Sequence, residues 1–152
     1  MSFTQSFSLS LKSVANALTV IASVGITYVG VSYLIDPAGT APGFGLPAWP
    51  HGDAAAFLNI KGVRDVATGI TCLALLLTGQ RRALSTVMFA FTLIPLGDAT
   101  VILSHGGSPV AAFGIHVATA VLVAATGFTL LRTSTPSGRT TQTSAAGSIQ
   151  AS

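Results

Sequence analysis

Five side chains that can exchange protons or hydrogen-bond to oxygen lie inside otherwise apolar stretches of this sequence. They are Tyr28, Arg64, Asp65, Asp98 and His116. Ionisable side chains inside membrane segments are rare and mark functional sites by default. Two carboxylates in a pocket of low dielectric can hold different protonation states, one as a base and the other as an acid. We therefore predict an acid–base site, suited to adding water or a substrate's own hydroxyl across a strained ring.

The same residues also have structural interpretations. Asp65 and Asp98 could form an ion-paired link between two helices, and Lys61 lies one turn before Asp65, where an i, i+4 pair forms easily. His116 could make an interhelical hydrogen bond instead of doing chemistry. Tyr28 alone is more often a packing residue or an interfacial anchor. Their joint occurrence favours a polar cavity over independent structural roles.

Arg64 and Asp65 point about 100° apart on a helix. We therefore expect Arg64 to reach toward Asp98, or else to extend outward to the membrane surface. A metal site is a weaker alternative, because Asp65, Asp98 and His116 lack the H-x-x-x-H or E-x-x-H spacing of metal ligands. Cys72 is the single cysteine, which excludes a disulfide framework, a Cys-rich zinc site and a C-x-x-C pair. We expect neither a metal nor a cofactor.

The elements that carry these residues are expected to span a membrane. Only 7% of the 152 residues are charged, whereas a soluble domain carries about 25%. Four apolar stretches approach the length of about 20 residues that a spanning helix needs, at residues 14–35, 63–78, 83–103 and 110–131. The second can extend back toward Asp53, a candidate N-cap. The predicted fold is all-α, an integral membrane four-helix bundle, and soluble enzyme classes are set aside.

Basic residues set the expected orientation, since they concentrate on the cytoplasmic side of membrane proteins. Five of the seven flank the spans on one side, namely Lys12, Arg81, Arg82, Arg132 and Arg139. Both termini are therefore expected in the cytoplasm. Residues 1–13 form an N-terminal cytoplasmic segment, 14–131 the transmembrane domain with an outside loop at 36–60, and 132–152 a disordered cytoplasmic tail. The membrane is the endoplasmic reticulum or the plasma membrane.

The four predicted spans bring one polar group each to a similar depth. Tyr28, Asp65, Asp98 and His116 lie about 13–15 residues from the cytoplasmic ends of their spans, or roughly 20–23 Å. This depth is in the outer half of a hydrocarbon core about 30 Å thick. Pro95 should loosen the third span one turn before Asp98 and open space there. The spacing thus predicts one polar layer.

Two further features bear on how this layer is enclosed. The outside loop combines prolines and glycines with the apolar Phe44, Leu46 and Trp49, so it either lies on the membrane surface or covers a cavity between the helices. Glycines in the spans are expected to allow close helix packing. They are Gly25, Gly30, Gly69, Gly97, Gly114 and Gly127.

Several short motifs resemble a family of small four-span membrane proteins, most of them of unknown function. The resemblance covers roughly residues 14–131 and is carried by the order and spacing of its motifs. They are Tyr28-x-Gly30, Phe44-Gly45-Leu46-Pro47, Gly62-Val63-Arg64-Asp65 followed by Gly69, Gly97-Asp98 and His116. Some members are similar to the membrane epoxide hydrolases of fungal polyene-polyketide pathways, of the aurovertin and citreoviridin type.

The resemblance implies that Arg64, Asp65, Asp98 and His116 do the chemistry and that Tyr28 lines the cavity. The implied reaction opens an epoxide with water or an internal hydroxyl, without nucleotide, flavin or metal. The expected partners are a lipophilic small-molecule substrate and the lipid bilayer, with no nucleic acid, and a homodimer is compatible with the sequence. Two alternatives stay open: a non-enzymatic binding or accessory protein with a buried polar network, and a small proton-coupled transporter.

Overall fold

The computed structural model describes residues 3–134, and all regular structure within them is helical. The elements are α1 (Phe3–Ile35), α2 (Pro37–Thr40), η1 (Ala41–Phe44), η2 (Gly52–Ala55), α3 (Ala56–Leu77), α4 (Arg81–Phe91), α5 (Leu93–Ser104), α6 (Pro109–Ala111), η3 (Ala112–Val117) and α7 (Ala118–Thr133). The predicted all-α class is confirmed. Most of the tail for which we predict disorder, including Arg139, lies outside the described residues.

Three helical segments of the described chain are long and apolar enough to cross a membrane. They are Ser10–Ile35, Arg81–Ser104 and Pro109–Thr133, and they agree with the first, third and fourth predicted spans. The second predicted span corresponds to α3, whose 22 residues would extend about 33 Å. Its length suffices for a crossing, but Lys61, Arg64 and Asp65 make it more polar than the others. The chain is a helical membrane bundle, and α3 is the helix with three charged residues in its first half.

The helix ends follow local sequence signals in part. Asp36, which precedes Pro37, ends α1 as expected because a residue before proline disfavours the helical conformation. Its carboxylate then caps α2 by accepting a hydrogen bond from the Gly39 amide at 2.9 Å. Asp53 does not cap α3 as predicted, because it lies within η2 and the residue before α3 is Ala55. Helix α1 also begins earlier than the predicted span and includes residues 3–13.

The third and fourth spans both depart from a regular α-helix. The third is interrupted at Thr92, between α4 and α5, three residues before the buried Pro95. Proline lacks an amide hydrogen and its ring displaces the carbonyl four residues before it, which is Phe91 here. The fourth contains η3, a π-helix of six residues that includes His116. Such π segments occur often at functional sites.

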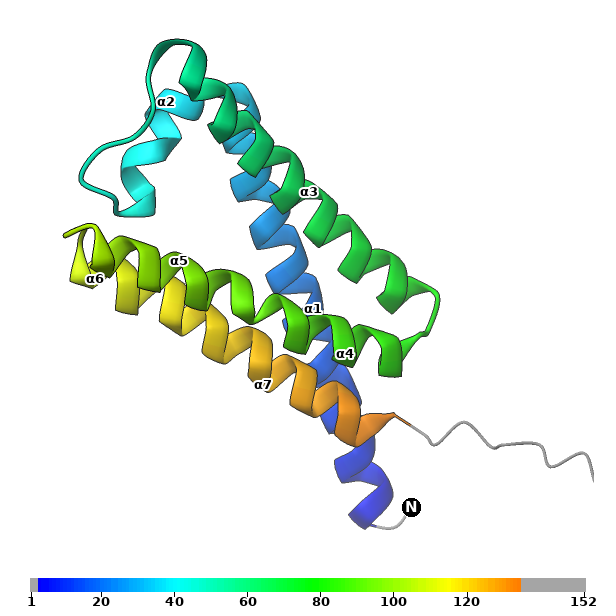
Figure 1. The fold of residues 1–152 in the computed structure, drawn as a ribbon. Helices are drawn as coiled ribbons and strands as arrows, with labels where there is room; N and C mark the ends of the chain where they lie inside the picture. The colour runs from blue at the N-terminus through cyan, green and yellow to red at the C-terminus, as the bar shows by residue number, and fades with distance from the viewer. Residues whose placement is uncertain (1–2, 135–152) are drawn as a thin grey trace, which may run out of the picture.

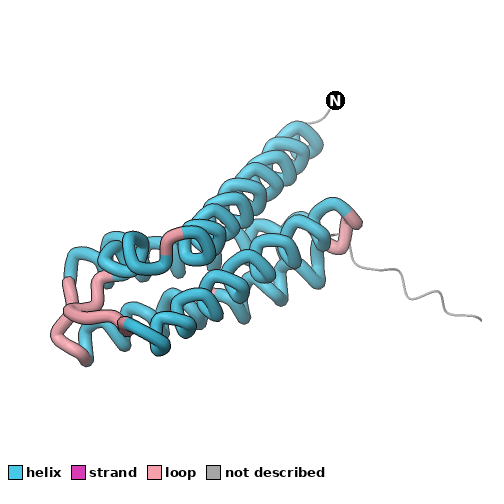
Figure 2. The backbone as a smooth tube through the Cα atoms, turned by 90° about the horizontal axis from the view of Figure 1, so that it is seen from above, coloured by secondary structure: helices cyan, strands magenta, loops and turns pink. Residues whose placement is uncertain are grey.

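The spans form two antiparallel pairs, α1 with α3 and α4–α5 with α7 (Figure 1). The pairs meet where α3 turns into α4 and diverge toward the other end of the bundle. The loop with α2 and η1 lies between them there, and we call this end the loop end (Figure 1). Figure 2 shows the loop segments gathered at this end when the bundle is seen from above. The start of α1 and the end of α7 lie at the opposite end.

Glycines fix the contact between α1 and α3. A Cβ on Gly30 would lie 2.7 Å from the Gly62 carbonyl oxygen and 2.7 Å from the Val66 amide nitrogen, and one on Gly69 would lie 2.6 Å from the Ser23 carbonyl oxygen. No side chain larger than hydrogen fits at these contacts. The expected close packing is thus found at Gly30 and Gly69.

The other span glycines behave differently. An added Cβ at Gly25, Gly97 or Gly114 would meet no atom within 4 Å, and one at Gly127 would make ordinary to slightly tight contacts. The expectation of close packing is therefore wrong for Gly25, Gly97 and Gly114. Nothing in a single sequence separates a glycine under a neighbouring helix from one facing open space.

Two apolar clusters hold the bundle together at its two ends. The cluster opposite the loop end contains Ala15, Cys72, Leu84, Met88 and Leu130, from α1, α3, α4 and α7. The cluster at the loop end contains Ala99, Ile102 and Ala112, against which the loop residues Phe44 and Leu46 pack. The predicted polar residues lie between these clusters along the helices.

The loop is also tied to the turn between α5 and α6. The Ser108 amide donates to the Gly45 carbonyl at 2.8 Å, and Gly45 has a φ of +103°, which side chains disfavour. An added Cβ on Gly107 would lie 2.5 Å from the Gly45 carbonyl oxygen. The loop therefore covers the space between the helix pairs, the second of the two arrangements considered from its sequence.

Candidate functional site

A cavity of about 460 Å³ lies between the two helix pairs. Its walls come from α1, α3, α4, α5 and α7, and most of the side chains that line it are apolar. Asp65 is the one charged residue in the lining. Ligand sites are commonly apolar cavities of this size with a few placed polar groups. The cavity therefore has the composition of a binding site for a lipophilic molecule, with a carboxylate at its loop end.

Asp65 is placed by the close contact of α1 with α3. Its Cβ lies 2.9 Å from where a Cβ on Gly30 would be, so the side chain leaves α3 beside the glycine contact. The residue is 7% exposed. Its carboxylate accepts a hydrogen bond from the Lys61 ammonium group one turn earlier on α3. This ammonium group supplies the opposite charge that a buried carboxylate requires.

Aromatic rings hold Lys61 in place. Its Nζ lies 4.7 Å from the centre of the Tyr33 ring and 5.5 Å from that of the Phe44 ring. Both distances are within the range of about 6 Å over which a ring face attracts a cation. Tyr33 comes from α1 and Phe44 from the loop, so the Lys61–Asp65 pair connects three parts of the chain.

Asp98 and His116 form a second pair of a carboxylate with a basic side chain. His116 Nδ1 lies 3.6 Å from the Asp98 carboxylate, and His116 Nε2 lies 3.0 Å from the Phe44 carbonyl oxygen. A carbonyl only accepts hydrogen bonds, so Nε2 carries a hydrogen. One further proton can then reside either on Nδ1 or on Asp98. The pair is therefore built to give up or take a proton.

The two pairs belong to one site. Phe44 connects them, because its ring centre lies 5.5 Å from Lys61 Nζ and 4.8 Å from the centre of the His116 ring. Pro95 and Thr119, which line the cavity, lie three residues, or about one helical turn, from Asp98 and His116 respectively. Both pairs thus lie at the loop end of the cavity. The structure brings together Asp65, Asp98 and His116, three of the five predicted site residues.

Arg64 is not part of this group. Its side chain is exposed and forms no ion pair with any residue between 3 and 134. The expectation that it reaches Asp98 is wrong, and the reason is the angle of about 100° between neighbouring residues on a helix. Because Asp65 faces α1 and the cavity, Arg64 faces outward, where it extends along the surface of the bundle.

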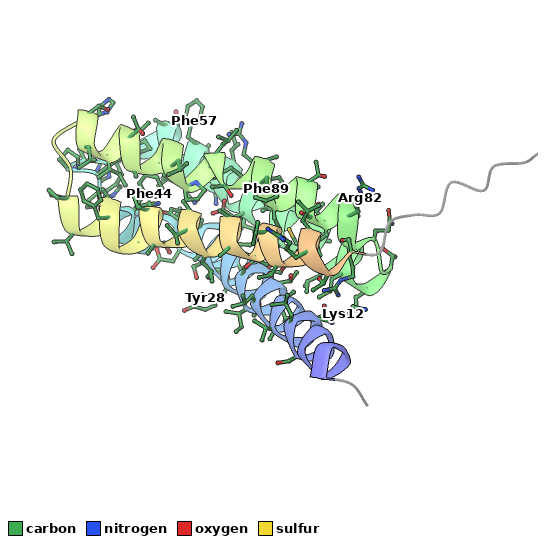
Figure 3. All side chains as sticks on the ribbon, turned by 90° about the horizontal axis from the view of Figure 1, so that it is seen from below. Lys12, Tyr28, Phe44, Phe57, Arg82 and Phe89 are labelled. Atoms are coloured by element: carbon green, nitrogen blue, oxygen red, sulfur yellow. The ribbon has the colours of Figure 1, made fainter. Side chains whose placement is uncertain are left out.

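Tyr28 lines the cavity from α1 but lies at its edge. It is 73% exposed, and Figure 3 shows it projecting from α1 away from the other helices. The tyrosine near the carboxylates is Tyr33, which is 3% exposed. Tyr33 is not among the residues predicted for the site, although it lies three residues after Gly30, one turn along the same helix face. That spacing is the signal that could have identified it.

A smaller cavity of about 220 Å³ lies above the ion pairs, under the loop. Aromatic residues of the loop and of α1 line it, including Tyr33, Phe44 and Trp49, together with Lys61. Within residues 3–134 no three His, Cys, Asp or Glu side chains are grouped closely enough to hold a metal ion. The polar groups at the loop end thus have an apolar cavity on one side and an aromatic pocket on the other.

Comparison with known proteins places the chain in a family but gives no activity. The family model described as "Domain of unknown function (DUF4267)" matches residues 23–130. No curated protein and no solved structure matches the chain. The matched region contains both ion pairs, the loop and every residue that lines the large cavity except Ile21 and Ala22.

Proposed function

The chain belongs to the family described as a domain of unknown function (DUF4267), and we propose that it is a membrane-embedded hydrolase or cyclase that opens a lipophilic epoxide by acid–base catalysis. The observation that carries this proposal is the position of Asp65, buried at one end of an apolar cavity of about 460 Å³ and beside a second carboxylate with its own proton partner. The resemblance of the Arg64-Asp65, Gly97-Asp98 and His116 motifs to membrane epoxide hydrolases supports the same reaction.

The reaction needs one base and one acid. Asp65, with Lys61 balancing its charge, accepts the proton that water or a substrate hydroxyl loses as its oxygen attacks an epoxide carbon. The bond between that carbon and the ring oxygen breaks, and the ring oxygen takes the proton held between His116 and Asp98. Return of a proton from Asp65 to this pair through solvent restores the site. Neither atoms nor charge are left unbalanced.

The environment favours a lipophilic substrate. The cavity is bounded by apolar side chains below Asp65, including Ile26, Met88, Phe91 and Leu122. The burial of such a surface by a hydrocarbon ligand is favourable, at about 25 cal/mol per Å². A small polar epoxide would gain little from these walls. We therefore assign the reaction to epoxides on long apolar or polyene chains.

A second candidate is a non-enzymatic binding or accessory protein. It is favoured by one specific observation, which is that both carboxylates already have partners inside the chain, Lys61 for Asp65 and His116 for Asp98. Such a network can serve to fix the packing of the helices and the loop. The two candidates differ in what removal of one carboxylate charge does to activity and to stability.

The test uses Asp65→Asn and Asp98→Asn in the chain purified in detergent with added lipid. Each variant keeps its size and loses its proton-accepting group, so turnover of a long-chain polyene epoxide should fall by about 100-fold or more. The matched control is Arg64→Gln, which removes a charge next to Asp65 that lies outside the site. Full turnover in both Asn variants would overturn the proposal. If the wild type does not turn over the epoxide and both Asn variants have lower thermal stability than the wild type, the result would support the accessory protein instead.

A further inference from the structure

The large cavity is open at its side, along α1. Ile21, Gly25 and Tyr28 all line it and all are exposed, Ile21 by 61% and Tyr28 by 73%. Their spacing of four and three residues puts them on one face of α1. A residue that both lines a cavity and lies on the surface marks where the cavity opens. Ile94 and Thr119 of the other helix pair also line the cavity and are exposed. We call the opening that has Ile21, Gly25 and Tyr28 on its α1 side the lateral opening.

The lateral opening lies within the part of α1 that crosses the membrane. Ile21, Gly25 and Tyr28 occupy the middle of the segment Ser10–Ile35 and span about 10 Å along the helix axis. The aqueous phases lie near the ends of this segment, and the hydrocarbon core of a bilayer is about 30 Å thick. A molecule that passes through the opening therefore comes from the lipid and not from water.

Gly25 keeps the opening wide. An added Cβ at this position would meet no atom within 4 Å, so the glycine does not serve to bring α1 close to another helix. A residue with a side chain at this position would instead narrow the opening between Ile21 and Tyr28. Gly25 therefore leaves the entrance to the cavity free, whereas Gly30 and Gly69 allow α1 to pack closely on α3.

The interior beyond the opening offers polar groups mainly at one end. The Thr68 hydroxyl donates to the Arg64 carbonyl at 2.8 Å and the Thr119 hydroxyl to the Ile115 carbonyl at 2.6 Å, so both are satisfied within their own helices. The Ser23 hydroxyl also lines the cavity, and it has no hydrogen-bond partner among residues 3–134. From Cys72 to Asp65 is seven residues, or about 10 Å along α3. A ligand thus finds a mainly apolar channel with the unpaired Ser23 hydroxyl in its wall and the Asp65 carboxylate at its loop end.

We infer that the substrate is a membrane-dissolved chain molecule that enters sideways from the bilayer through the lateral opening and lies with its oxygen-bearing end at Asp65 and its apolar part toward Cys72. The inference rests on the proposed function only in treating the occupant as a substrate. The class of ligand follows from the route, because a molecule that arrives through hydrocarbon is one that partitions into it.

Cys72 is the chain's one cysteine and lines the cavity beyond the opening, so its reaction reports access. The full chain is placed in phosphatidylcholine vesicles with reagent on both sides. The reagents are propyl methanethiosulfonate, which is uncharged, and its charged sulfonatoethyl analogue. Mass spectrometry of the intact protein gives the rate at which each reagent modifies Cys72. Each rate is divided by the rate of the same reagent with the chain unfolded in SDS. We expect the uncharged reagent to be at least about tenfold faster, since charge opposes transfer through hydrocarbon.

Substitutions at the opening then test the route itself. Gly25→Phe should slow the reaction of the uncharged reagent several-fold, and Gly25→Leu should slow it less. Val24→Phe is the matched control, because Val24 is the next residue of α1, is exposed and does not line the cavity. An unchanged rate in both Gly25 variants, equal rates for the two reagents, or no reaction of the folded wild type would each overturn the inference. No epoxide enters this assay, so its result is independent of the proposed reaction.

Discussion

At the scale of single residues, the site depends on which partner each polar group has. Asp65 is paired with Lys61 and Asp98 with His116, and the two pairs differ in what they can do. Lys61 is surrounded by the rings of Tyr33 and Phe44, which fix its position. His116 Nε2 is hydrogen-bonded to the Phe44 carbonyl, and its Nδ1 lies 3.6 Å from the Asp98 carboxylate, with which it can exchange one proton. The Lys61–Asp65 pair thus has a fixed position, and the His116–Asp98 pair can exchange a proton.

The two roles of His116 can be separated by substitution. In His116→Gln the side-chain amide can still donate to the Phe44 carbonyl, but it cannot exchange a proton with Asp98. We expect turnover to fall by about 100-fold, while the emission of Trp49, the one tryptophan and a loop residue, stays unchanged. His116→Ala should lose turnover and also shift the Trp49 emission to the red, because the loop loses its contact. Wild-type turnover in His116→Gln would show that His116 only holds the loop.

How much of the site could be predicted differs from residue to residue. Asp65, Asp98 and His116 stand out because ionisable groups in apolar stretches are costly, and equal depth in three helices brings them together. The Lys61–Asp65 pair follows from i, i+4 spacing. The outward direction of Arg64 depends on which face of α3 meets α1, and the role of Tyr33 depends on the approach of Phe44 from 11 residues later in the chain. Both are set by tertiary packing, which one sequence does not reveal.

At the scale of helices, small residues decide where the site can form. The contact of Gly30 with the backbone at Gly62 and Val66 brings α1 against α3 and directs Asp65 into the cavity. On the other pair, Asp98 lies one turn after Pro95, which follows the interruption at Thr92, and His116 lies within the π-helix η3. Helix existence and type were predictable from apolar length. The π-helix was not, because an extra residue in a helical turn has no pattern in the sequence.

The helix contact makes a prediction for stability. Gly30→Ala places a methyl group 2.7 Å from backbone atoms of Gly62 and Val66, which cannot move without shifting α3. We expect a loss of about 1–3 kcal/mol in the free energy of unfolding and a lower melting temperature in detergent. Gly97→Ala is the control, since its added Cβ meets nothing within 4 Å and alanine is the better helix former. Equal melting temperatures for the two variants would show that α1 and α3 are not held this closely.

At the scale of the whole molecule, the fold combines an apolar cavity open to lipid with polar groups collected at one end. The two helix pairs meet at one end of the bundle and diverge at the other, where the loop lies between them (Figure 1). Scarcity of charge predicts the membrane environment, and three segments meet the requirements for spanning it. The charged residues of α3 are the exception that points to the site, because Lys61 and Asp65 face the loop end of the cavity.

The central claim is that these groups open an epoxide on a lipophilic chain. The most direct measurement incubates the wild-type protein in lipid vesicles with a long-chain polyene epoxide in isotopically labelled water, followed by mass spectrometry of the products. We predict either a diol that carries one oxygen from water or an unlabelled cyclic ether of the same mass as the substrate, formed faster than in protein-free vesicles and lost in Asp65→Asn. Loss of the epoxide at the same rate with and without the protein would contradict the account.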